Sequence, residues 1–151
     1  MEIPCVLVRG GTSKGVYIRG DDLPADIGER DKVISMLFGS PDARQINGLG
    51  GGDPLTSKVA ILAPSTRKDC DVTYLSGEVR LGSSEINYGI MCGNLASGVG
   101  LAAHHLNLLE SSKHESIIRI FNTNTSSVIH ADYADFAGGI SGKTTEVDLV
   151  F

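Results

Sequence analysis

A lysine at the end of a glycine-rich stretch is the first residue of this chain with the means to do chemistry. The stretch NGLGGGDPLTSKVAIL covers residues 47–62, and Lys58 stands where the glycines give way to the apolar run 59–62. Apolar neighbours that partly exclude water favour the neutral form of a lysine, and a neutral amine can act as a base. The alternative is a lysine at a strand edge whose ammonium group reaches water.

The glycines around Lys58 do not match a nucleotide-binding motif. A phosphate-binding loop requires G-x-x-x-x-G-K-[ST], but counting from Gly52 the second glycine position holds Ser57 and the last position holds Val59. A dinucleotide fingerprint fails from Gly48, because its third glycine position holds Asp53. We therefore interpret these glycines as positions where the backbone approaches a small ligand closely.

A second segment, RGGTSKG at residues 9–15, combines glycines with the hydroxyl groups of Thr12 and Ser13 and with two cations. Successive backbone N–H groups in such a turn can form a concave site for an anion. The alternative is an ordinary hairpin turn whose charges are solvated. Composition alone leaves both interpretations open.

A third segment, Cys92-Gly93-Asn94, stands directly before an expected helix. A cysteine in that place faces the positive end of the helix dipole, which favours the thiolate. Gly93 and Asn94 offer backbone N–H groups and an N-cap side chain to a carboxylate. The alternative is a small buried hydrophobic residue, the usual role of a lone cysteine.

No other catalytic set is evident in the sequence. It contains no Ser-His-Asp arrangement, no cofactor motif and no metal-ligand spacing, and the adjacent His104 and His105 would point about 100° apart on a helix. We therefore expect no cofactor and no metal. The three segments together favour proton transfer next to a carboxylate.

Length and composition favour one folded domain in a reducing compartment. The chain has 151 residues, a net charge of −5 and three cysteines, of which Cys5 lies in an apolar run and should react slowly. The acidic charge argues against a nucleic-acid partner but not against an acidic substrate at a local site. No apolar run reaches about 18 residues, and no signal peptide is evident, so we expect a cytoplasmic protein without a membrane partner.

Apolar periodicity and turn residues predict an α+β fold, with mostly antiparallel strands around one long apolar helix and a shorter helix outside. A loop of about 15 residues, from Ser40 to about Pro54, is long enough to favour a functional role. The expected helices are residues 29–38 and 94–109. The expected strands are residues 3–8, 15–18, 59–62, 71–75, 78–81, a segment near Ile86, 116–122, 127–133 and 146–151, with a glycine-rich turn at 138–142.

Three blocks in fixed order, PCVLVRGGTSKGVYI, GSPDARQINGLGGGDPLTSKVAIL and CGNLASGVG, resemble the PrpF family of cofactor-independent isomerases. The resemblance covers roughly residues 3–122. It implies the diaminopimelate epimerase-like fold, in which two similar domains each curl a twisted sheet around a central helix and the active site lies between them. Residues 1–151 would then be the N-terminal half of a two-domain isomerase, completed by a missing C-terminal domain or by self-association.

The resemblance also implies roles for the three segments. Lys58 matches the family's catalytic lysine, and Cys92 matches the cysteine that faces the substrate. The residues expected to hold the carboxylates of a small polycarboxylate substrate are Thr12, Ser13, Ser57, Gly93 and Asn94.

The implied reaction shifts a double bond in an unsaturated or keto tricarboxylate. The middle block is closer to 4-oxalomesaconate tautomerase, and 2-methylaconitate cis-trans isomerase is the alternative. Met91 stands where a polar residue is expected, which leaves open a carboxylate-binding domain of the same fold without turnover.

Overall fold

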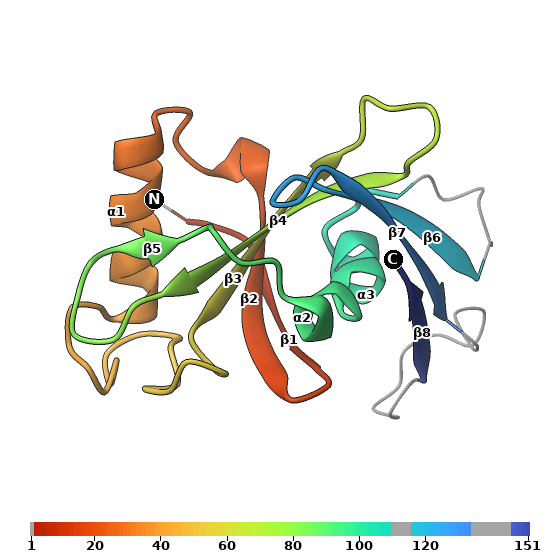
Figure 1. Cartoon of the computed structure of the whole chain (residues 1–151). Coiled ribbons are helices and arrows are strands. Elements are labelled where there is room, and N and C mark those ends of the chain that lie inside the picture. Colours follow the sequence, from red (N-terminus) through yellow and green to blue (C-terminus); the bar gives the residue numbers. More distant parts are fainter. Residues whose placement is uncertain (1, 110–115, 134–145) are drawn as a thin grey trace.

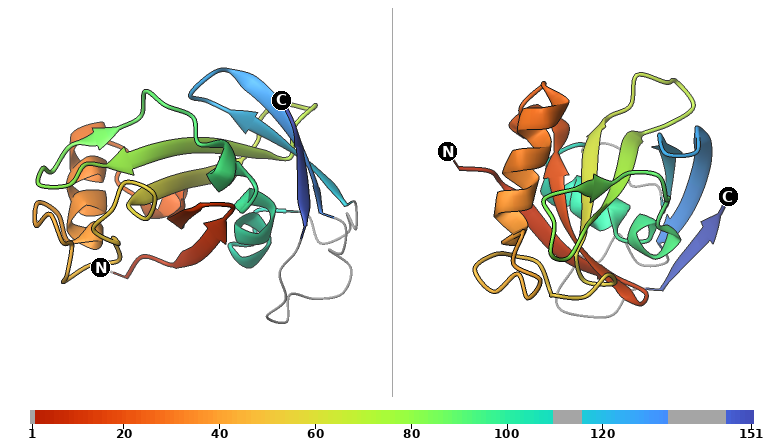
Figure 2. Two further views of the ribbon diagram at one scale, coloured as in Figure 1. Left: turned by 60° about the horizontal axis from the view of Figure 1, so that its bottom comes forward. Right: turned by 60° about the vertical axis from the view of Figure 1, so that its left-hand side comes forward.

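The computed structural model describes residues 2–109, 116–133 and 146–151, and within them a single curled sheet wraps around two short helices (Figure 1). A third, longer helix lies on the outer face of the sheet (Figures 1 and 2). The strands are β1 (Cys5–Gly10), β2 (Ser13–Arg19), β3 (Lys58–Pro64), β4 (Val72–Val79), β5 (Ile86–Asn87), β6 (Ile117–Asn122), β7 (Ser127–Tyr133) and β8 (Val147–Val150). The helices are the 3₁₀ turn η1 (Gly20–Asp22), α1 (Ile27–Phe38), α2 (Gly93–Ala96) and α3 (Val99–His105).

The sheet is mixed, and antiparallel pairs predominate, as predicted. The strand order is β1-β2-β3-β4-β6-β7-β8, with β5 paired to β4. Two neighbouring pairs are parallel, β2 with β3 and β4 with β6, and the others are antiparallel. The chain therefore has the predicted α+β architecture. The predicted turn at residues 138–142 lies outside the described residues.

Helix α1 has a defined start and stop. The Asp26 side chain accepts a hydrogen bond from the amide of Glu29, and Gly39 closes the helix in the left-handed region with φ of 80°. The helix thus begins two residues before the predicted start and ends as predicted. Its buried side chains Ile34 and Phe38 pack on the outer face of β2 and β3.

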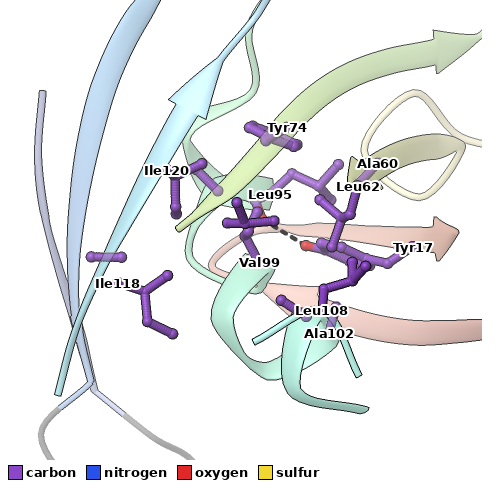
Figure 3. Packing of buried hydrophobic residues seen from close by; sticks show 14 of the residues in the cluster. Tyr17, Ala60, Leu62, Tyr74, Leu95, Val99, Ala102, Leu108, Ile118 and Ile120 are labelled. Atoms are coloured by element: carbon purple, nitrogen blue, oxygen red, sulfur yellow. Dashed lines mark hydrogen bonds between the residues drawn. The ribbon is translucent and has the colours of Figure 1, made fainter. Parts of the chain in front are cut away.

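The predicted single helix at residues 94–109 is wrong, because the structure has two short helices, α2 and α3, that meet at Ser97 and Gly98. The Tyr17 hydroxyl donates to the Leu95 carbonyl at 2.6 Å, and the Gly98 amide donates to the same oxygen at 3.0 Å. A Cβ on Gly98 would collide with the Tyr17 hydroxyl. The close approach of β2 therefore breaks the helix. Both α2 and α3 still pack in the inner core, the cluster of buried side chains that includes Tyr17, Leu62 and Tyr74 (Figure 3).

The two strands predicted at residues 71–75 and 78–81 are one continuous strand, β4. The sequence Ser76-Gly77 suggested a turn, but Gly77 lies inside the strand. A Cβ on Gly77 would come within 2.9 Å of the side chains of Ile86 and Tyr88. The glycine therefore allows close packing under β5.

Candidate active site

One face of three neighbouring strands forms the floor of the candidate site. Along β3, side chains alternate between faces, so Lys58 points to the same side as the inner-core residues Ala60 and Leu62. The register places Lys58 opposite Gly15 of β2 and opposite Glu78 of β4. Side chains two residues along those strands, Ser13 on β2 and Ser76 on β4, share this face.

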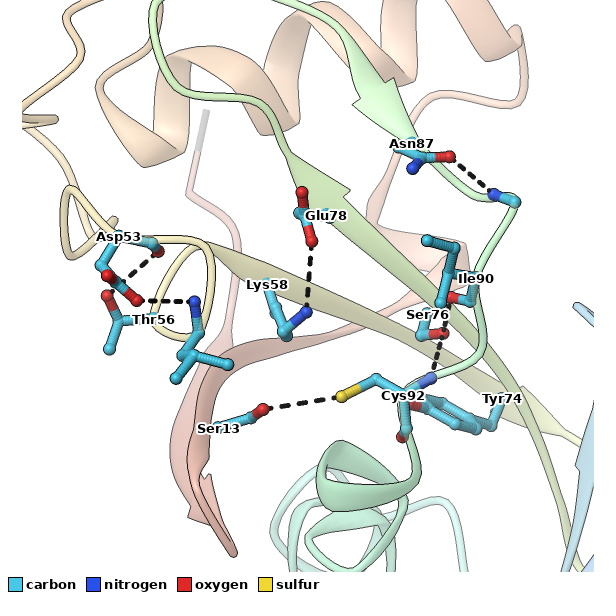
Figure 4. A network of polar contacts seen from close by, with 12 residues as sticks. Ser13, Asp53, Thr56, Lys58, Tyr74, Ser76, Glu78, Asn87, Ile90 and Cys92 are labelled. Carbon is cyan, nitrogen blue, oxygen red and sulfur yellow. Dashed lines mark hydrogen bonds and ion pairs between the residues drawn. The ribbon is translucent and has the colours of Figure 1, made fainter.

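Lys58 is largely removed from water and has a carboxylate partner. Its Nζ lies 3.4 Å from Oε2 of Glu78, and the exposed fractions of the two side chains are 14% and 34% (Figure 4). The partial desolvation agrees with the expectation from the apolar run after Lys58. The carboxylate was not anticipated, and it stabilises the lysine whenever the lysine carries a proton.

The two segments that were predicted to bind anions meet beside this floor. The Cys92 thiol lies 3.7 Å from the Ser13 hydroxyl, and Asn94 Nδ2 donates to Thr12 Oγ1 at 2.8 Å. The close approach of these two segments requires glycine at position 10, because a Cβ on Gly10 would collide with the backbone oxygen of Asn94. The structure therefore brings residues that are 79 and 82 positions apart in the chain into one cluster.

Cys92 and Gly93 do not precede a long helix as the sequence suggested. Cys92 is the N-cap of α2, which begins at Gly93 and is only four residues long. The expectation of a long helix dipole behind the thiol is therefore wrong. Met91, the departure from the family pattern, packs partly buried against the inner core.

Two side-chain hydroxyl groups of β4 form hydrogen bonds with the backbone of Cys92 and hold it in place. Its carbonyl accepts from the Tyr74 hydroxyl at 3.0 Å, and its amide donates to the Ser76 hydroxyl at 3.2 Å (Figure 4). Burial raises the pKa of Tyr74, so the phenol remains a neutral donor at neutral pH. Tyr74, Ser76 and Glu78 occupy alternate positions of β4 and therefore share one face. The sequence analysis missed this pattern because it placed a turn at Ser76 and Gly77.

Ser57, predicted to contact the substrate, has its side chain turned into the glycine-rich loop. It is fully buried, and its hydroxyl donates to Gln45 Oε1 at 2.6 Å. The same oxygen accepts from the amide of Gly52, and Gln45 Nε2 donates to Ser40 Oγ. Gln45 therefore organises the loop from within, and no pattern in the sequence identified it.

The three cysteines differ in environment. Cys92 is partly buried, and Cys70 is buried, which raises the pKa of its thiol. Cys5 is exposed, so the apolar burial that was expected to slow its reaction is not present. It lies on β1, which pairs only with β2 among the described strands and leaves one edge open.

Within residues 2–109, 116–133 and 146–151, no group of three or more His, Cys, Asp or Glu side chains could hold a metal ion. No described helix has the length and apolar character needed to cross a membrane.

A family model for the PrpF protein matches residues 1–149, and the chain belongs to this family. It is 48% identical to 3-methylitaconate isomerase of Eubacterium barkeri over 87% of the chain and 35% of that protein. It is 43% identical to 4-oxalomesaconate tautomerase of Pseudomonas putida over 99% of the chain and 44% of that protein.

A solved structure supports the same relationship. The crystal structure of methylitaconate-delta-isomerase superposes with a TM-score of 0.82 at 47% identity, covering 88% of this chain and 34% of that one. The chain thus spans less than half the length of these relatives.

Proposed function

We propose that the chain forms one side of the active site of a cofactor-independent isomerase that moves a double bond by proton transfer. The observation that carries the proposal is the convergence of Lys58 and Cys92 on one face of the sheet. The donor groups of Thr12, Ser13 and Asn94 lie beside them. A base next to hydroxyl, amide and backbone donors suits a substrate that carries carboxylates.

The reaction begins with removal of a proton. Neutral Lys58 takes a proton from a carbon that a neighbouring carbonyl or conjugated carboxylate makes acidic, and the C–H electron pair becomes part of a dienolate. Glu78 stabilises the ammonium group that results. Donation of a proton two carbons away completes the shift of the double bond, with no net gain or loss of protons.

The role of Cys92 has two readings. Its thiol can supply the second proton, after which the thiolate regains a proton from solvent as Lys58 loses its own, or it can line the site while Lys58 performs both transfers. The thiol donates to Ser13 on the face of the sheet that also carries Lys58, and this placement favours the first reading.

We also propose the diaminopimelate epimerase-like fold, in which this chain is the N-terminal of two similar domains. The sheet curled around α2 and α3 and the share of 34–44% of its relatives support this arrangement. The second side of the cleft then comes from a C-terminal domain or from another copy of the chain.

The proposed substrate is an unsaturated or keto tricarboxylate of the 4-oxalomesaconate type. An unsaturated dicarboxylate of the methylitaconate type is the second candidate, favoured by the 48% identity to a 3-methylitaconate isomerase. A relative named 2-methyl-aconitate isomerase, from Cupriavidus necator, is 38% identical, and 2-methylaconitate is therefore the third candidate substrate.

The test is proton NMR of 4-oxalomesaconate, 3-methylitaconate and 2-methylaconitate with the full-length protein that carries the proposed second domain. We expect isomerisation of one substrate by the full-length protein and little by the 151-residue chain. Binding of a substrate without turnover by the full-length protein would instead identify a carboxylate-binding domain.

A further inference from the structure

Asn124, in the turn between β6 and β7, binds a residue 48 positions earlier through both ends of its amide. Asn124 Oδ1 accepts from the Ser76 amide at 2.9 Å, and Nδ2 donates to the Ser76 carbonyl at 2.9 Å. The pairing of β4 with β6 ends at Tyr74 and Asn122. The Asn124 side chain therefore replaces a neighbouring strand at Ser76.

The same amide reaches the segment that leads to Cys92. The second proton of Asn124 Nδ2 is donated to the Tyr88 carbonyl at 2.8 Å. Both protons of the amide are thus used, one on β4 and one on residues 88–92. Asn124 holds these two parts of the chain at a fixed separation.

Ser76 continues the connection to the candidate site. Its hydroxyl accepts from the Cys92 amide at 3.2 Å. Its single proton has two acceptors within reach, the Ile90 carbonyl and Asn124 Oδ1, both at 3.1 Å. The Cys92 backbone is therefore linked through Ser76 to a side chain that does not itself contact Cys92.

From this chain of contacts we infer that Asn124 is a positioning residue, which fixes Cys92 over the sheet through Ser76. This inference rests on the proposed function only for its catalytic consequence. The position of the thiol can be measured without any substrate.

The test is the alkylation rate of each cysteine in the 151-residue chain, measured by mass spectrometry with iodoacetamide at constant pH. Exposed Cys5 is an internal reference, and the informative quantity is the ratio of the Cys92 rate to the Cys5 rate. Asn124→Ala should raise this ratio at least threefold, because residues 88–92 lose their brace and the thiol leaves Ser13 more often.

A matched control lies in the same turn. The Thr125 hydroxyl donates to Asn122 Oδ1 and lies 2.7 Å from Ser127 Oγ. Thr125→Ala should destabilise the turn without changing the ratio. Ser76→Ala should raise the ratio of the Cys92 rate to the Cys5 rate as Asn124→Ala does. The variant with both substitutions should show no higher ratio than either single variant, because both residues act on Cys92 through the same chain of hydrogen bonds.

An unchanged ratio in Asn124→Ala, or an equal rise in Thr125→Ala, would overturn the inference. If Asn124→Ala does not fold, Asn124→Asp decides the question in the same way, because it keeps an acceptor oxygen and loses both donated bonds. In the full-length protein, Asn124→Ala should lower kcat at least threefold with little change in KM. A wild-type protein without isomerase activity would defeat the proposed function, whereas the alkylation ratio would still test the positioning role.

Discussion

Replacing Gly10 by alanine should push the turn at residues 10–13 away from the segment that carries Cys92 and Asn94. The added methyl group would collide with the Asn94 backbone oxygen and lie 2.7 Å from Ser97 Oγ. The serine side chain can rotate, but the backbone oxygen is part of α2 and cannot. The turn must therefore move.

The cost follows from two terms. Forcing a methyl group into a packed contact costs about 1–3 kcal/mol. Loss of the hydrogen bond between Thr12 and Asn94, which is exposed, adds about 0.5–1 kcal/mol. We expect the free energy of unfolding to fall by about 1.5–4 kcal/mol, which lowers Tm by roughly 3–16 °C for a chain of this size.

The assay is urea unfolding followed by circular dichroism, together with the Cys92 alkylation rate. Gly20→Ala is the matched control, because a Cβ there would lie 3.7 Å from Ile61 Cγ2 and from the Leu62 oxygen, an ordinary contact. It should change stability by less than about 1 kcal/mol. If Gly10→Ala is no less stable than Gly20→Ala and its Cys92 reacts as in the wild type, the close contact between the two segments is not what holds the site.

Two further substitutions separate stability from function. Tyr133→Phe should lower the free energy of unfolding by about 1–3 kcal/mol, because the Tyr133 hydroxyl accepts a hydrogen bond from the Gly100 amide at 2.7 Å. This amide lies in the first turn of α3, where it has no acceptor within the helix. A loss below about 0.5 kcal/mol in urea unfolding would contradict the expectation. Glu78→Gln should change the free energy of unfolding by less than about 1 kcal/mol, because the carboxylate of Glu78 is 34% exposed and water screens its attraction to Lys58. In the full-length protein, the same substitution should lower kcat about fivefold, equivalent to about 1 kcal/mol of lost stabilisation of the protonated lysine, and an unchanged kcat would remove Glu78 from the mechanism.

Local signals in the sequence predicted much of the fold. The stop of α1 at Gly39 and the bounds of β7 follow from apolar runs and from glycine in its usual capping role, and β3 begins one residue before its predicted start at Val59. Each of these signals acts within a few residues. The α+β class follows from the same patterns.

The errors arose where a distant residue decides the local structure. The break between α2 and α3 depends on Tyr17, and the continuity of β4 through Gly77 depends on Ile86 and Tyr88 packing over it. The candidate site shows the same division. Motifs identified Lys58 and Cys92, but the pairing partners Glu78 and Ser76 became visible only once the strand register was known.

The central claim is that Lys58 moves a proton to and from carbon. The most direct measurement is deuterium incorporation from D₂O into the carbon-bound positions of the substrate, followed by NMR with the full-length protein. The wild type should exchange the proton at the reacting carbon, whereas Lys58→Ala and Lys58→Arg should not, because alanine has no base and arginine stays charged. Exchange by either variant at more than a few per cent of the wild-type rate, with the fold intact, would show that another group is the base.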